Sequence, residues 1–153
     1  WNAGSLLGAG LDDLAAIAPF AAAGVLVALV LSPGLNALAL GDDVARSQGA
    51  NVARIRIGVV VAVTLLAGAA TALAGPISFV GLMVPHVVRW LVGTDQRAIL
   101  PMSLVVGPIV VLTADILGRL LIAPAEVPVG IVVAFVGAPI LVALARRRTA
   151  RAL

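Results

Sequence analysis

The stretch IGVVVAVTLLAGAATALAGPISFVGLMVPHVV, residues Ile57–Val88, contains no Asp, Glu, Lys or Arg over 32 positions. A single helix of this length would be about 48 Å long, whereas the hydrocarbon core of a bilayer is about 30 Å thick. The chain must therefore turn within the stretch. The segment AGPIS, Ala74–Ser78, brings Gly and Pro together and is a strong turn signal. We expect two membrane helices, over about 56–74 and 77–92, the second short and interrupted by Pro85.

The same composition extends along the whole chain. Of its 153 residues, 62% are hydrophobic and 11% are charged, whereas a soluble domain carries roughly 25% charged residues. This pattern predicts an all-α, polytopic transmembrane helix bundle, with residues 1–153 as part of a single transmembrane domain. Further spans are expected over about 14–38, 99–122 and 127–145, which makes about five. Because the sequence opens at Trp1 inside what reads as a continuing segment, we expect the C-terminal part of a longer protein.

The distribution of arginine predicts the orientation in the membrane. All ten basic residues are Arg. With five spans, nine of them fall on one face: in the segment 40–56, in the connection that holds Arg89 and Arg97, and in the tail from Arg146 onward. The other face carries Arg119, Asp12, Asp13 and Glu126. Since cytoplasmic loops carry an excess of basic residues, the face with nine arginines and the C-terminus are predicted to be cytoplasmic.

The sequence lacks the patterns of intramembrane enzymes and of nucleotide sites. Without Cys there is no disulfide, thiolate metal site or cysteine nucleophile. His86 is the single histidine, and no His-Glu-x-x-His, Gly-x-Ser-x-Gly or phosphate-binding glycine loop occurs. We expect no catalytic residue, no metal site and no cofactor in this chain. The net charge of +3 comes from arginines at span ends, so nucleic acid is not an expected partner, whereas membrane lipid is.

Polar residues within the expected spans need an explanation, because they are costly in a bilayer. Asp115 and Arg119 are spaced i, i+4, so they share a helix face and can pair. They would form either a structural ion pair or the coupling pair of an ion-gradient-driven transporter. His86 follows Pro85 and can hydrogen-bond a carbonyl that the proline leaves without its helical donor, so a structural role is expected.

Small residues at four-residue spacing predict helix-packing faces, because lipid supplies no hydrophobic drive for helix association. Two such series occur: Ala67, Thr71 and Gly75, and Gly130, Ala134 and Ala138. Each series would let a neighbouring backbone approach closely.

Four blocks carry a resemblance to a known family: LGDDVARSQGANV (Leu40–Val52), GPISFVGLMVPHVVRWLVGTDQRAILP (Gly75–Pro101), ADILGR (Ala114–Arg119) and EVPVGIVVAFVGAPILVAL (Glu126–Leu144). In order and spacing they resemble the permease subunits of bacterial ABC importers of the FecCD/BtuC type, which take up iron–siderophores, haem and vitamin B12. The resemblance implies a subunit of about ten membrane helices, of which this chain would supply the last five.

The resemblance also implies partners and a location. The permease would lie in the bacterial cytoplasmic membrane, with a cytoplasmic C-terminus. It would pair with a second permease copy or homologue and with an ATP-binding cassette subunit that holds ATP and Mg. A periplasmic or lipid-anchored substrate-binding protein would deliver the ligand. Within this family the ligand could be an iron chelate, haem or cobalamin.

The polar island at 40–52 acquires a role from the resemblance. In the family, the corresponding cytoplasmic loop forms two short helices in a groove of the ATPase subunit. The residues themselves suit a short helix, because Asp42 and Asp43 favour the positive end of a helix and Gly49 can end it in the left-handed conformation. The expected coupling loop comprises Leu40, Gly41, Asp42, Asp43, Val44, Ala45, Arg46, Ser47 and Gly49.

Arg119 acquires a second role from the resemblance, which implies that it faces a glutamate on the rim of the binding protein. Three function classes follow from the sequence. The preferred one is the permease of an ATP-driven importer. The alternatives are an ion-gradient-driven secondary transporter that uses Asp115 and Arg119, and a structural membrane module without a transport role.

Overall fold

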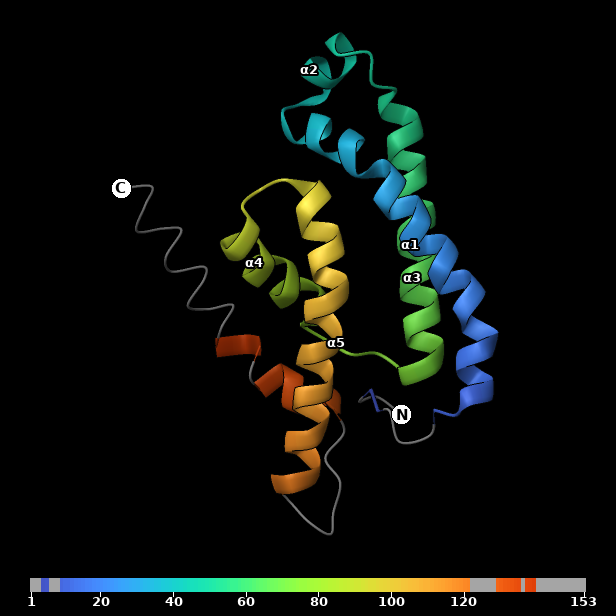
Figure 1. Cartoon of the computed structure of the whole chain (residues 1–153), viewed down its shortest axis with the longest axis vertical. Coiled ribbons are helices and arrows are strands. Elements are labelled where there is room, and N and C mark those ends of the chain that lie inside the picture. The colour runs from blue at the N-terminus through green and yellow to red at the C-terminus, as the bar shows by residue number, and fades with distance from the viewer. Residues whose placement is uncertain (1–3, 6–8, 122–128, 136, 140–153) are drawn as a thin grey trace.

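A computed structural model describes residues 4–5, 9–121, 129–135 and 137–139, and the described helices form an elongated bundle without a strand (Figure 1). The expected all-α class is confirmed. The five helices within 9–121 are α1 (Leu11–Ala39), α2 (Asp42–Ser47), α3 (Val52–Ala74), α4 (Val80–Val92) and α5 (Gln96–Leu121). Residues 129–135 and 137–139 are also helical.

Three of these helices are long and apolar enough to cross a membrane. Stretches of 18 residues within α1, α3 and the first 25 residues of α5 reach mean hydropathies of 2.5, 2.3 and 2.0. Helix α4 has 13 residues, about 20 Å, which is shorter than a bilayer core. The expected span 127–145 lies mostly outside the described residues, as do Glu126 and the arginines from Arg146 onward.

Helices α3 and α5 each begin a few residues before their apolar runs, because polar side chains cap their first turns. Helix α3 begins at Val52 rather than at 56, because Asn51 Oδ1 accepts a hydrogen bond from the Arg54 backbone N–H at 3.0 Å. Asp95 Oδ1 accepts one from the Arg97 N–H at 2.8 Å, just before α5. Such caps satisfy backbone donors that a helix end leaves open. Polar caps therefore extend the helices beyond the apolar cores that define the spans.

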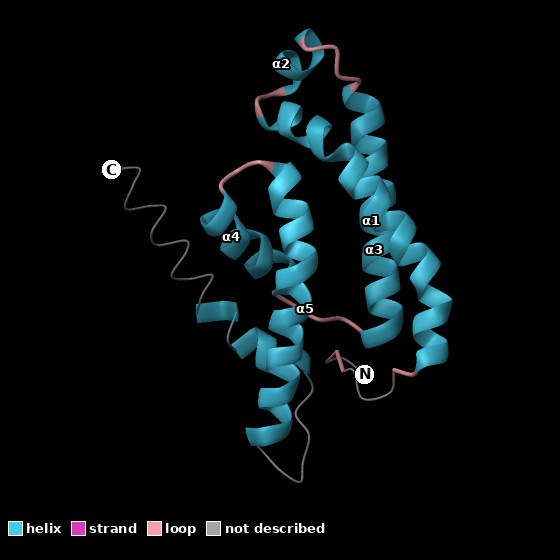
Figure 2. Ribbon diagram, viewed as in Figure 1, coloured by secondary structure: helices cyan, strands magenta, loops and turns pink. Residues whose placement is uncertain are grey.

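Helices α1 and α3 lie antiparallel and side by side (Figure 2). Glycines let them approach: a Cβ on Gly24 would lie 2.8 Å from Leu66 Cγ, and one on Gly34 would lie 2.7 Å from Ile55 Cδ1. Ala67 and Thr71 of the expected packing series are exposed, so this series does not pack against the described helices. The buried face of α3 instead comprises Val52, Ile55, Ala62, Ala69 and Ala74.

A proline near the C-terminal end of α1 is accommodated by the side chain beside it. Pro33 has no N–H, so the Leu29 carbonyl four residues earlier loses its helical donor. The Ser32 hydroxyl donates to this carbonyl at 2.7 Å, and Ser32 is buried. The last turns of α1 swing toward the N-terminal end of α5 (Figure 1). The Leu29 carbonyl is thus hydrogen-bonded although the apolar helix bends at Pro33.

The second half of the described chain packs around α5. Val84 and Val88 of α4 form one buried cluster with Ile99 of α5. A second cluster joins Ala114 of α5 to the helical segment 129–139. The break between α3 and α4 spans residues 75–79, at the expected turn, and there Gly75 and Phe79 both have φ of 69°. This short crossing loop lets α4 pack on α5 instead of continuing α3.

Candidate functional site

Helix α2 is a short knob between two membrane-spanning helices. It has six residues, and Asp42 and Asp43 lie in its first turn, where carboxylates interact favourably with the helix dipole. Gly41 and Gly49 flank it with φ of 106° and 81°, a region open chiefly to glycine. The loop implied by the resemblance has two short helices. Here one forms, because the segment after Gly49 passes directly into the Asn51 cap of α3.

The residues of the expected coupling loop divide between an outer and an inner surface of α2. Leu40 and Val44 are 64% and 41% exposed, although both are apolar. Ala45 is fully buried, so it seats the helix against its own chain rather than presenting a contact surface. Ser47 donates to the Val44 carbonyl at 2.8 Å. The outer surface therefore offers a small apolar patch, Leu40 and Val44, at the charged end of the molecule.

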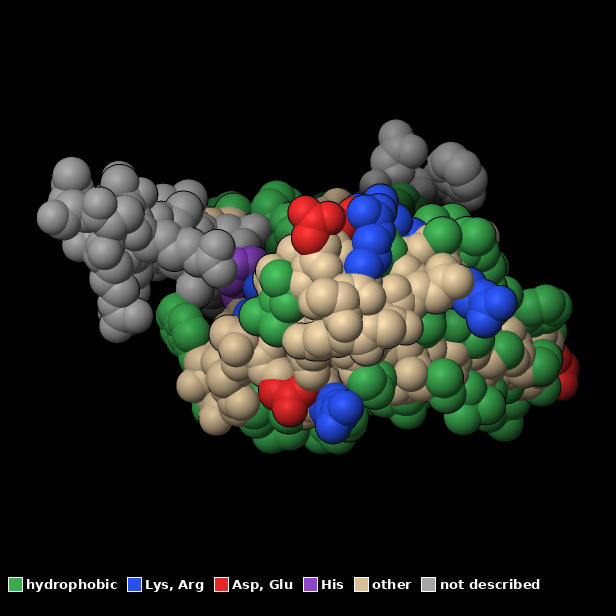
Figure 3. All heavy atoms as spheres, turned by 90° about the horizontal axis from the view of Figure 1, so that it is seen from above, with side chains coloured by type: hydrophobic (Ala, Val, Ile, Leu, Met, Phe, Trp, Pro, Cys, Tyr) green, Lys and Arg blue, Asp and Glu red, His purple; other side chains and the backbone are tan. Residues whose placement is uncertain are grey.

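Two ion pairs involve the aspartates of α2. Arg56 Nη2 donates to both carboxylate oxygens of Asp42, at 2.7 and 3.0 Å, and so ties α2 to the first turn of α3. Arg46 Nη1 lies 3.6 Å from Asp43 Oδ1 in a looser, exposed pair. Seen from this end, acidic and basic side chains lie among hydrophobic and uncharged ones (Figure 3). The Asp42–Arg56 pair is therefore a direct polar link between α2 and α3.

A second polar link joins α1 to α5 near the same end. Asn36 Nδ2 donates to Asp95 Oδ1 at 2.6 Å, and Asn36 Oδ1 accepts from the Gln96 backbone N–H at 2.8 Å. The Asn36 amide, helped by the backbone N–H and the charge of Arg97, holds the pKa of Asp95 below its ordinary value. Sequence reasoning missed Asn36. Its signal was an isolated amide in an otherwise uncharged membrane segment.

His86 contacts a helix carbonyl, as expected, but not the one that Pro85 leaves without a donor. A proline at 85 frees the carbonyl of Gly81, four residues earlier. His86 Nδ1 lies 2.8 Å from the carbonyl oxygen of Leu82 instead. Since a carbonyl only accepts, Nδ1 carries the proton in this contact. The ring thus closes a hydrogen bond within α4.

Asp115 and Arg119 pair at the opposite end of α5 from the polar links. Arg119 Nε donates to Asp115 Oδ2 at 2.9 Å, so the expected pairing is present. The Asp115 side chain is 17% exposed and the Arg119 side chain is 46% exposed. Arg119 follows Gln96 by 23 positions, about 35 Å along a straight helix. It therefore lies about one membrane thickness from the Asp95 link.

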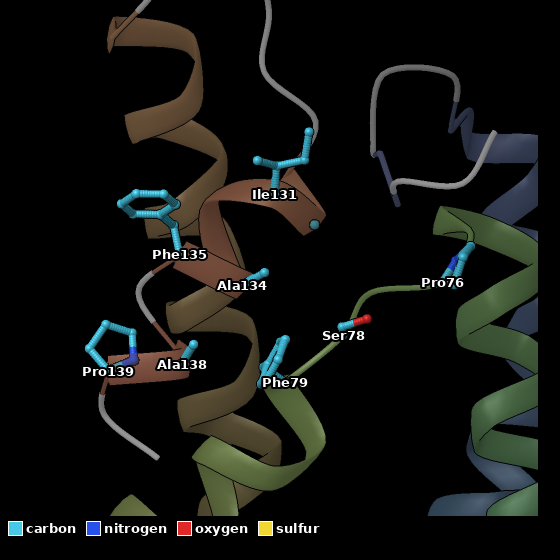
Figure 4. Close-up of a pocket in the computed structure, with 9 residues that line it drawn as sticks. Pro76, Ser78, Phe79, Ile131, Ala134, Phe135, Ala138 and Pro139 are labelled. Atoms are coloured by element: carbon cyan, nitrogen blue, oxygen red, sulfur yellow. The ribbon is translucent and has the colours of Figure 1, made fainter. Parts of the chain in front are cut away.

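An open, largely apolar hollow of about 620 Å³ lies beside the start of α4 (Figure 4). Phe79 of the crossing loop borders it from one side, and Ala134 and Ala138 of the last helical segment from the other. Gly130 also lines it, so the second small-residue series borders a hollow. The described residues hold no group of three or more metal-ligating side chains.

Comparison with known proteins matches residues 1–147 to the FecCD transport family. The chain is 48% identical over 150 residues to the ferric enterobactin transport system permease protein FepD of Escherichia coli, a match that covers 97% of this chain and 44% of FepD. It is 43% identical over 147 residues to the probable siderophore transport system permease protein YfiZ of Bacillus subtilis, covering 96% and 44%.

A solved structure described as an inward-facing conformation of a metal-chelate type ABC transporter is similar with a TM-score of 0.89 and 31% identity. That match covers 96% of this chain and 47% of the other. The chain therefore spans less than half the length of the proteins that it matches.

Proposed function

The chain belongs to the FecCD transport family, and we propose that it works as part of a permease subunit that carries iron(III) chelates across the bacterial cytoplasmic membrane. The relatives named above support this substrate class, since one is named for ferric enterobactin and another for siderophores. A multi-pass membrane protein is consistent with three apolar helices of spanning length. Haem and cobalamin are the other ligands of the wider family resemblance.

The observation that carries the proposal is α2, a short helix that exposes Val44 and, just before it, Leu40 at the arginine-rich end. In the proposed mechanism, an ATP-binding cassette subunit holds ATP and Mg and grips this knob from the cytoplasm. Movement of that subunit shifts α2. The Asp42–Arg56 pair passes the shift to α3, and the Asn36–Asp95 link passes it to α5. The membrane helices then open on alternate sides.

Two further partners complete the proposed assembly. A second permease copy or homologue forms the other half of the pathway. A periplasmic or lipid-anchored binding protein docks on the outer face, where Arg119 presents a guanidinium that can grip a carboxylate with two hydrogen bonds. The pairing with Asp115 supports this role, because it holds the Arg119 side chain from the same helix face.

A substitution at the exposed patch tests the coupling role. In the full-length permease assembled with its ATP-binding subunit, Val44→Asp places a carboxylate in the proposed apolar contact. An unpaired buried charge costs a few kcal/mol or more, so stimulated ATPase activity and uptake should fall by about tenfold or more. Arg54→Gln lowers the charge by the same one unit at an exposed position outside α2 and serves as the matched control.

The result also separates the function classes. If Val44→Asp leaves ATPase activity and uptake at wild-type levels, α2 is not the contact. Uptake that collapses with the ion gradient and ignores loss of the ATP-binding subunit would instead support a secondary transporter built on Asp115 and Arg119.

A further inference from the structure

A polar hollow lies where the C-terminal end of α2 meets the start of α3. Its volume is about 390 Å³. Two of its lining residues are arginines and none is acidic. The lining comprises Arg46, Ala50, Asn51, Val52, Ala53 and Arg56. The hollow is therefore cationic, and it continues the surface of α2.

The two arginines are held from outside the hollow. Asp42 binds Arg56 at 2.7 Å, and Asp43 lies 3.6 Å from Arg46. Both aspartates belong to the first turn of α2 and neither lines the hollow. A guanidinium has five N–H donors, and Asp42 engages only Nη2 of Arg56 within the described chain. Each arginine thus keeps donors for a further acceptor.

Asn51 adds a neutral donor to the same lining. Its Oδ1 is committed to the N–H of Arg54 in the α3 cap, so its Nδ2 group is the part of the side chain left to bind another molecule. Two guanidinium groups and an amide N–H form a set of donors. A carboxylate, which only accepts when ionised, complements such a set.

We propose that this hollow receives the carboxylate of an Asp or Glu side chain from the ATP-binding subunit, an inference that rests on the proposed docking of that subunit on α2. The partner follows from the place of the hollow, because Arg46 and Ala50 make it continuous with α2. All six lining residues precede the uncharged run that begins at Ile57. The hollow therefore lies outside the hydrocarbon core, at the end of the molecule that the proposed function places in the cytoplasm.

The charged contact complements the apolar one on the same knob. Burial of Leu40 and Val44 does not depend on direction. Hydrogen bonds from Arg46 and Arg56 to a carboxylate do, and so they fix the position of α2 on the ATP-binding subunit. Charged contacts at the edge of an interface act mainly on association rate, specificity and salt dependence. Assembly of the permease with the ATP-binding subunit should therefore weaken as ionic strength rises.

Arg46 is the residue to change, because its pair with Asp43 is exposed and contributes little to folding. The affinity of the ATP-binding subunit for the full-length permease in nanodiscs is measured at low and high salt, with Arg46→Gln and Arg46→Glu. Arg46→Glu should weaken binding by about tenfold at low salt and less at high salt. Arg54→Glu is the matched control, since Arg54 is exposed, lies outside the hollow and forms no ion pair with the described residues.

A charge swap identifies the partner group. An Asp-to-Arg and Glu-to-Arg scan of the ATP-binding subunit should yield one variant that restores binding to Arg46→Glu but not to Arg54→Glu. If Arg46→Glu binds like Arg54→Glu while Val44→Asp still weakens binding, the hollow is not a carboxylate site and the docking of α2 stands. If neither Val44→Asp nor Arg46→Glu changes binding, both the carboxylate site and the proposed docking of α2 are wrong. A loss that appears only in nanodiscs with anionic lipid, and that no swap restores, would assign the hollow to a lipid headgroup instead.

Discussion

Asn36 of α1 and Asp95 before α5 are 59 positions apart in the sequence, and Asn36 Nδ2 donates to Asp95 Oδ1 at 2.6 Å. Asn36 also accepts from the first N–H of α5. One amide thus binds both the cap and the backbone of a distant helix. Since Asn36 lies one turn before the end of α1, this link fixes the segment that leads into α2 against the α4–α5 half of the molecule.

The first prediction concerns this link. Asn36→Ala removes a donor to Asp95 and the acceptor of the Gln96 N–H, so the free energy of unfolding should fall by about 1–3 kcal/mol. Thermal unfolding of the purified permease in detergent measures the loss. Ser47→Ala removes an exposed hydrogen bond within α2 and is the control. Equal melting temperatures for both variants would show that the link does not stabilise the fold.

The second prediction concerns pH. The pKa of Asp95 is lowered in the folded state, so its stabilising contribution is fully present above the unfolded value of about 3.9 and is lost as pH falls through the folded pKa. Asp95→Asn cannot show this dependence. The difference in melting temperature between wild type and Asp95→Asn should be constant near neutral pH and shrink in the acid range below about pH 4. A difference that does not change with acid would contradict the assignment.

The third prediction concerns the α1–α3 contact. A Cβ at Gly24 would lie 2.8 Å from Leu66 Cγ and 3.2 Å from Leu65 Cβ, whereas one at Gly68 would meet no atom within 4 Å. Gly24→Ala should therefore lower stability by about 1–3 kcal/mol through overpacking. Gly68→Ala gains helix propensity and should be neutral or stabilising. Melting temperatures compare the two variants. If Gly24→Ala is as stable as Gly68→Ala, close packing of α1 against α3 at Gly24 does not contribute to stability.

The fourth prediction concerns the outer end of α5. Arg119→Glu places a carboxylate one turn from Asp115 and reverses the charge offered to a binding protein. It should weaken binding-protein docking in a salt-dependent way and leave basal ATPase activity unchanged. Surface plasmon resonance with the loaded binding protein measures the docking. The double variant Asp115→Asn/Arg119→Glu removes the repulsion within α5 and controls for misfolding.

A reversal on the partner completes that test. A binding protein whose rim glutamate is replaced by Arg should recover part of the affinity for Arg119→Glu. If Arg119→Glu does not insert stably, the double variant inserts, and no swap restores docking, Arg119 serves only as the structural partner of Asp115.

Several local features followed from the sequence because they depend on nearest neighbours. The turn after Ala74 comes from adjacent Gly and Pro, whose backbone preferences end a helix. The i, i+4 spacing brings Asp115 and Arg119 together once a helix exists. Helix α2 lies between Gly41 and Gly49, the residues that can adopt its flanking positive φ angles. Composition alone decided that these helices lie in a membrane.

The contacts between helices needed the tertiary structure. Ala67, Thr71 and Gly75 have a packing pattern, yet α3 turns the face with Ile55 and Ala62 toward its neighbours, because α1 approaches at Gly24 and Gly34. Asn36 gave no sign of its partner Asp95, which follows three further helices along the chain. The sequence by itself determined which segments are helical and where they turn, since backbone preference and apolar length are local properties. The tertiary structure decided which faces meet and that Asn36 binds Asp95, since those choices depend on the summed packing of helices that are distant in the sequence.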